Sequence, residues 1–151
     1  MEFAIDLIHN QVFLSASGSW FAAQMIKIIL DIVKNGFSWK RLAGGGGMPS
    51  SHSATVTGLA TAAALVYGGG SFEFVIALFF AFIVMYDAAG VRMATGEEAR
   101  ILNLLKKRDA EDGKAPLYET DLDEKMGHTI PEIIAGIVIG IVVAIIMCNL
   151  W

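Results

Sequence analysis

Two histidines lie in stretches whose residues are of the types that bind anions. His52 ends the stretch "GGGGMPSSH", and the glycines of this stretch, Gly47 among them, leave backbone N–H groups uncovered. Ser50 and Ser51 add hydroxyls beside that backbone. His128 begins the stretch "HTIPEIIAG" much later in the chain. Because an imidazole acts as a nucleophile or as an acid near neutral pH, these residues predict an anion site in which phosphate is preferred over sulfate or carboxylate.

Ionisable residues inside apolar stretches are further candidates for this site. Lys27 lies in an apolar stretch at helical spacing from Gln24 and Asp31. A charged group within a membrane span faces the bundle interior and marks a site or an ion pair, so the alternative for Lys27 is a structural pair with Asp31. Asp87 and Arg92 end another apolar stretch. Arg92 could instead reach the membrane interface, and Asp87 could instead pair with Lys27 or Arg92.

Charge-poor blocks long enough to cross a bilayer provide the scaffold. The chain has 151 residues, of which 55% are hydrophobic and 17% charged, which is too apolar for an ordinary soluble domain. Because a span needs about 20 apolar residues, we predict an all-α polytopic membrane helix bundle that forms one domain, residues 1–151. About four transmembrane helices are expected, at residues 12–35, 49–68, 73–93 and 129–150. The acids in "MEFAIDLIHN" argue against a removable signal peptide.

The placement of positive charge predicts the orientation in the membrane. Every Lys and Arg except Lys27 falls in the loop after the first predicted span or around the loop 94–128. Positively charged loops stay in the cytoplasm, so both termini are expected outside. The second and fourth spans then begin, and the third ends, at the cytoplasmic face. This topology brings His52, His128, Arg92 and Lys27 together at that face, where helix N-termini also attract anions.

The loop 94–128 is the one long stretch expected outside the membrane. Its first part, "TGEEARILNLLKKR", is typical of a short amphipathic helix, and Thr95 and Glu98 have capping-box spacing. We expect this helix to lie along the cytoplasmic lipid surface. Residues 109–125 are acidic and contain helix breakers, so they are expected to form a solvated linker.

Four stretches of the chain resemble a known family. "MPSSHSA" resembles the Pro-Ser-Gly-His motif of the type 2 phosphatidic acid phosphatase and vanadium haloperoxidase superfamily, and "GHTIPEIIAGIVIG" resembles its last motif. Together with "SWFAAQMIK" and "IVMYDAAGVRMATGEEARILN", these motifs make residues 17–145 most similar to the divergent branch of that superfamily. The members of this branch are small membrane proteins called acid phosphatase/haloperoxidase-related.

The resemblance implies catalytic roles for three residues. His128 matches the nucleophile that forms a phosphohistidine, and His52 matches the general acid that protonates the leaving oxygen. Glu132 matches the acid that holds the nucleophilic imidazole, although the family usually has Asp there. Glu132 also has capping-box spacing from Thr129, so a helix cap is its alternative role.

The resemblance also implies phosphate binders, with some departures from the family pattern. Ser50, Ser51 and neighbouring amides such as that of Gly47 match phosphate-binding positions, and Ser51 replaces the usual glycine. Arg92, with Asp87 nearby, is the candidate for the arginine of the last motif, although it lies much further along the chain from the nucleophile than in the family.

The family's first motif, a Lys followed after six residues by Arg-Pro, is absent as written. Lys27, Lys40 and Arg41 are the candidates to replace it, and Lys27 is preferred because its position inside a span is the most costly to explain otherwise.

The sequence therefore predicts a membrane phosphatase that hydrolyses a lipid phosphate or diphosphate monoester through a phosphohistidine. No metal or cofactor is expected, and the expected partners are the lipid phosphate and the bilayer rather than nucleic acid. A second copy of the chain is a candidate partner, because Gly136 and Gly140 have the spacing of close helix packing. The alternative function is a non-catalytic lipid-phosphate binding or carrier protein.

Overall fold

The computed structural model describes residues 2–36, 47–115 and 118–150. Its regular elements are six helices within these ranges, and no strand occurs among them: α1 (Glu2–Ile8), α2 (Gln11–Asn35), α4 (Ser51–Tyr67), α5 (Phe72–Ala89), α6 (Val91–Glu111) and α7 (Ile130–Asn149). The all-helical class predicted from the sequence is confirmed. The short helix α1 was not predicted.

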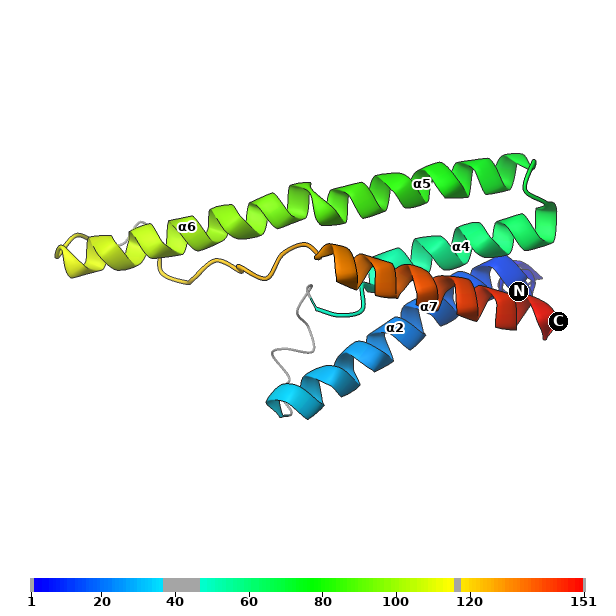
Figure 1. Ribbon diagram of the computed structural model, residues 1–151, viewed down its shortest axis with the longest axis horizontal. Helices are drawn as coiled ribbons and strands as arrows, with labels where there is room; N and C mark the ends of the chain where they lie inside the picture. The colour runs from blue at the N-terminus through cyan, green and yellow to red at the C-terminus, as the bar shows by residue number, and fades with distance from the viewer. Residues whose placement is uncertain (1, 37–46, 116–117, 151) are drawn as a thin grey trace.

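Helix α4 is the centre of the bundle, with α2, α5 and α7 packed around it (Figure 1). It is made largely of small residues, and those that face its neighbours are buried: Ala54, Ala60, Ala62 and Ala63. Lipid tails are as apolar as Leu, so helices in a membrane associate by close packing of small residues rather than by a hydrophobic driving force. The composition of α4 therefore suits a helix enclosed by other helices.

Glycines set how closely α4 approaches its neighbours. A Cβ on Gly58 would collide with Ser19 of α2, one on Gly136 with the carbonyl of Ser50, and one on Gly140 with the carbonyl of Ala54. The spacing of Gly136 and Gly140 is therefore used inside the chain, against α4, and does not supply a surface for a second copy.

Three of the four predicted spans have the length and hydropathy of membrane-crossing helices: α2, the apolar part of the α5–α6 rod, and α7. Helix α4 has only 17 residues, which corresponds to about 26 Å, and it is covered on several sides. Both chain ends lie at the end of the molecule where α4 turns into α5 (Figure 1). This arrangement agrees with the prediction that both termini share one side of the membrane.

Helix α6 continues the direction of α5, which differs from the predicted surface helix (Figure 1). Helical hydrogen bonds cross the junction, since the amide of Gly90 donates to Tyr86 (2.9 Å) and the amide of Ala94 donates to Gly90 (2.9 Å). The predicted capping box at Thr95 is wrong, because α6 begins at Val91 and the Thr95 hydroxyl donates to the Val91 carbonyl (3.0 Å). The helix therefore projects beyond the bundle instead of folding across its end.

The described part of the connection from α6 to α7 is largely exposed to solvent, as predicted, but hydrogen bonds hold it on α6. Residues 118–128, the return segment, run back along α6 (Figure 1). The Asn103 amide donates to the Leu122 carbonyl (3.0 Å) and accepts from the Leu122 amide (3.0 Å). Lys106 donates to the Glu119 carbonyl (2.8 Å) and to Asp121 (2.9 Å). These side chains hold the return segment on α6 and so fix where α7 can begin.

Candidate active site

His52 is positioned by the capped start of α4. The Ser50 hydroxyl accepts from the Ser53 amide (3.2 Å) and from the Ser53 hydroxyl (3.0 Å), which fixes the first turn. The Ser50 amide in turn donates to the Glu132 carbonyl on α7 (3.0 Å). Ser50 is fully buried and Ser51 nearly so. The structure thus shows Ser50 as a helix cap that ties the two helix starts together.

His128 stands at the start of α7 with its ring buried, only 4% of the residue being exposed. Its amide donates to the carbonyl of Ala88 at the end of α5 (2.9 Å). Its Nδ1 lies 2.6 Å from the carbonyl oxygen of Gly127. A carbonyl only accepts hydrogen bonds, so this contact places the proton on Nδ1 and leaves a lone pair on Nε2. The buried Nε2 has no hydrogen-bond partner in the part of the chain that the structure describes.

The two histidines meet, as the topology predicted. Their ring centroids are 5.8 Å apart and the rings are tilted by 59°. His52 is exposed whereas His128 is buried. The pair therefore combines the buried imidazole of His128, which the Gly127 carbonyl holds, with the exposed imidazole of His52, which can change its orientation.

The spacing of the rings can be compared with what phosphoryl transfer needs. Attack begins from about 3–3.5 Å, and a general acid must be about 2.6–3.2 Å from the leaving oxygen. With a P–O bond between, the two reactive nitrogens need to be roughly 7–8 Å apart. Rings centred 5.8 Å apart are too close for that if their nitrogens face each other. His52, which is exposed, is the ring that would swing outward.

Glu132 takes the alternative role that the sequence left open. Its Oε2 accepts from the backbone amide of Thr129 (2.9 Å), and the two residues form a capping box. Helix α7 begins only at Ile130, so His128 lies outside the helix and does not share a helix face with Glu132. The hydrogen bond that the resemblance assigned to Glu132 is made instead by the Gly127 carbonyl.

Gly127 is a site residue that the sequence reasoning missed. Its φ is +81°, and a Cβ there would lie 2.5 Å from the amide nitrogen of Met93 and 2.9 Å from the carbonyl carbon of Arg92. Only glycine allows the return segment to approach α6 so closely. Gly127 thereby holds His128 against the helix turn that carries Arg92. The available signal was a glycine directly before the candidate nucleophile.

Two of the predicted cations, Lys27 and Arg92, lie within electrostatic range of His52. Arg92 Nε lies 2.8 Å from Asp87, and both side chains are about half exposed, at 51% and 43%. This pairing is the structural alternative foreseen for Asp87. Lys27 and Arg92 are both close enough to His52 for their charges to act on its imidazole. The role of Lys27 in place of the missing first motif stays a prediction, and the other two candidates, Lys40 and Arg41, lie outside the described residues.

Lys27 comes from α2 and lies beside the start of the α4 segment. A Cβ on Gly47 would be 3.8 Å from its Cγ. Its ammonium makes no ion pair within 4 Å among the residues described, and the charge of Glu132 acts on it. Lys27 therefore lies next to Gly47 and lines the same cavity as Glu132 of the first turn of α7.

Comparison with known proteins identifies the family of the chain. Residues 8–143 match the family model described as "Divergent PAP2 family". The chain belongs to the divergent PAP2 family. The uncharacterized membrane protein YuiD of Bacillus subtilis is 35% identical over 142 residues, which cover 87% of this chain and 90% of that protein. No solved structure matches. The family resemblance seen in the motifs is confirmed over a slightly different range from the predicted 17–145.

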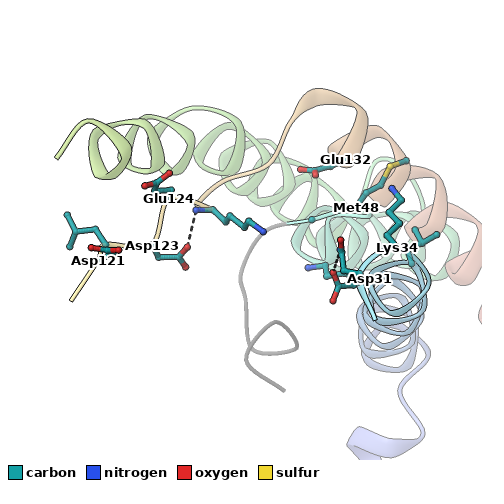
Figure 2. Close-up of a pocket in the computed structure, with 13 residues that line it drawn as sticks. Asp31, Lys34, Met48, Asp121, Asp123, Glu124 and Glu132 are labelled. Atoms are coloured by element: carbon teal, nitrogen blue, oxygen red, sulfur yellow. Dashed lines mark hydrogen bonds between the residues drawn. The ribbon is translucent and has the colours of Figure 1, made fainter. Parts of the chain in front are cut away.

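This divergent PAP2 protein has a cavity of about 820 Å³ between α2, the return segment and the start of α7, and neither histidine lines it. Figure 2 shows Asp31 and Lys34 of α2 on one side, with Asp121, Asp123 and Glu124 of the return segment opposite. Lys27, Gly47 and Glu132 also line it. The cavity therefore shares Lys27, Gly47 and Glu132 with the candidate site but does not include the histidine pair. No group of three or more His, Cys, Asp or Glu residues arranged to hold a metal ion occurs in the described ranges.

Proposed function

We propose that this protein is a membrane phosphatase that hydrolyses a lipid phosphate or diphosphate monoester through a phosphohistidine on His128. The observation that supports this most is the histidine pair, in which His52 lies in the first turn of α4 and His128 lies just before α7. His128 has Nδ1 bonded to the Gly127 carbonyl, so Nε2 keeps the lone pair that a nucleophile needs. Family membership supports the same chemistry.

The reaction would proceed in two steps. In the first, Nε2 of His128 attacks phosphorus while His52, as imidazolium, donates its proton to the leaving oxygen. This forms the N–P bond and releases the alcohol, or a lipid phosphate if the substrate is a diphosphate. In the second, neutral His52 takes a proton from water, which attacks phosphorus and frees inorganic phosphate. Phosphoryl transfer depends mainly on positioning and charge neutralisation, and Lys27 and Arg92 are placed to neutralise the phosphate oxygens.

We further propose that the site faces the cytoplasm, because the positively charged loops flank it. The chain has a single cysteine, Cys148. In a Cys148→Ser background, a cysteine introduced at Gly113 should resist an impermeant maleimide in intact cells and react after permeabilisation. Labelling of that cysteine in intact cells would place the site on the outer face.

A non-catalytic lipid-phosphate binder is the second candidate function. It is favoured by the covered Nε2 of His128 and by rings that lie closer than in-line transfer requires. A protein of this kind would bind the anion through Lys27 and Arg92 without turnover.

The test is phosphate release by the purified protein from a panel of alkyl phosphates and diphosphates. Release is expected for wild type and absent for His128→Ala. His9→Ala is the matched control, because the third histidine also contacts a backbone carbonyl through Nδ1, that of Ile5 (2.8 Å), but follows α1. Saturable binding without release from any substrate would favour the non-catalytic binder.

A further inference from the structure

A second hollow, apolar and of about 440 Å³, lies over the other half of α4. It opens between the first half of α2 and the first half of α5, and α4 forms its floor. Its lining includes Phe13, Ala16, Leu59, Ala63, Ile76 and Phe80. We refer to it as the apolar groove.

The floor of the apolar groove and His52 lie on one face of α4. His52, Thr55, Leu59 and Ala63 follow one another at spacings of three or four residues, which places them in a line along the helix. The first three are less buried than most of α4. The groove and His52 therefore lie in line along α4, with Thr55 between them.

The same two helices border this face at both ends. Beside the groove, α2 contributes Ala16 and α5 contributes Phe80. Beside His52, the charges of Lys27 on α2 and of Asp87 at the end of α5 act on the imidazole. One continuous face thus has cationic and imidazole groups at one end and an apolar groove at the other.

The lengths also match a lipid. With 1.5 Å per residue, Leu59 is about 10 Å and Ala63 about 17 Å along the axis from His52. Half of a hydrocarbon core of about 30 Å is about 15 Å, which is the depth that one leaflet's chains occupy. A chain anchored by its phosphate at His52 would reach the groove.

We propose that the apolar groove binds the hydrocarbon chain of the lipid phosphate whose headgroup lies at the histidine pair. This inference rests on the proposed function. It makes the substrate a long-chain phosphate held by one end in the cation-rich site and by the other along α4. Because a lipid chain in a bilayer or micelle is already out of water, the groove would favour its binding through close packing contacts with the chain rather than through the hydrophobic effect.

The experiment compares hexadecyl and hexyl phosphate at equal mole fraction in detergent micelles, and it measures the ratio of their kcat/KM values. Ala16→Phe, which fills the groove, should lower this ratio at least tenfold relative to wild type. Leu59→Ala, which removes contacts with the chain, should lower it several-fold. Ser17→Phe is the matched control, because Ser17 is the exposed neighbour of Ala16 and does not line the groove; its ratio should stay at the wild-type value.

A ratio unchanged in Ala16→Phe and Leu59→Ala, with both proteins folded by thermal unfolding, would overturn the inference. An equal loss in Ser17→Phe would do so too. Binding of the non-hydrolysable hexadecyl and hexyl phosphonates, measured by calorimetry on the same variants, separates this inference from the proposed function. If no phosphate is released but the phosphonates show the expected selectivity, the phosphatase fails and the groove stands. If phosphate is released without chain selectivity, the groove fails alone.

Discussion

Replacement of Gly127 by alanine should separate the two helix turns that form the candidate site. The new Cβ would lie 2.5 Å from the amide nitrogen and 2.7 Å from the Cα of Met93, both backbone atoms that cannot rotate away. The return segment must shift by about 0.5 Å to lengthen the contact between this Cβ and the Met93 nitrogen to 3.0 Å. It must shift by about 1 Å to reach an ordinary van der Waals contact. The return segment carries His128, so this shift moves the candidate nucleophile away from Arg92.

The size of the effect follows from two separate costs. An alanine in the left-handed region costs about 1–2 kcal/mol of stability. A displacement of about 1 Å in a catalytic group can cost about 10²-fold in rate. We therefore expect Gly127→Ala to lower kcat about 10²-fold and to lower the melting temperature by several degrees.

Gly113→Ala is the matched control for the backbone cost. Gly113 also has a positive φ, +75°, but a Cβ there meets nothing within 4 Å. It should lose stability to a similar extent and keep its turnover. The assay is phosphate release from a long-chain alkyl phosphate, with thermal unfolding measured on the same samples. Wild-type turnover in Gly127→Ala, or an equal loss of turnover in Gly113→Ala, would refute the reasoning.

Three further substitutions test individual roles. His52→Ala should slow hydrolysis of an alkyl phosphate about 10²–10⁴-fold and that of an aryl phosphate far less, because the aryl leaving oxygen needs no proton; equal losses would remove His52 from the role of general acid. Lys27→Met should raise KM strongly in a protein that still folds, as measured by steady-state kinetics and thermal unfolding, and a loss of folding instead would point to a structural role. Glu132→Gln should change kcat less than threefold, because Gln also caps a helix start, whereas a loss of about 10²-fold would restore Glu132 as the acid that orients His128.

The bundle and the meeting of the two histidines could be predicted because the bilayer restricts the possibilities. A charge-poor block of about 20 residues has few alternatives to a membrane helix, and the order of the blocks places the starts of α4 and α7 at one face. The inward orientation of Lys27 could be predicted for the same reason, since a charged group in a membrane span must face the interior of the bundle. Figure 1 shows the arrangement that this reasoning gives.

The course of α6 could not be predicted, because its pattern fits two environments equally. The apolar residues of "RILNLL" suit a helix that lies on a lipid surface and also one that projects from the bundle, and in the structure Ile101, Leu102, Leu104 and Leu105 remain exposed. The side chain that decides between them is Asn103, which binds Leu122 and Glu124 on the return segment. Nothing in the sequence around Asn103 indicates that its hydrogen-bond partners lie about 20 residues later, on the return segment.

The role of Glu132 was ambiguous for a different reason. The same residue fits both roles. A capping box needs Glu three residues after Thr129, and the family motif needs an acid four residues after His128. The choice depends on where α7 begins. Because it begins after Thr129, the carboxylate reaches the Thr129 amide, and the Gly127 carbonyl holds the imidazole.

The most direct measurement of the central claim is the trapping of the phosphohistidine. Purified protein is mixed with a radiolabelled alkyl phosphate and quenched in alkali, and the acid-labile label is mapped to a peptide. We predict label on the peptide that contains His128 in wild type, more label in His52→Ala with an aryl phosphate because hydrolysis of the intermediate is slowed, and none in His128→Ala. Label that persists in His128→Ala, or that maps to another peptide, would contradict the account.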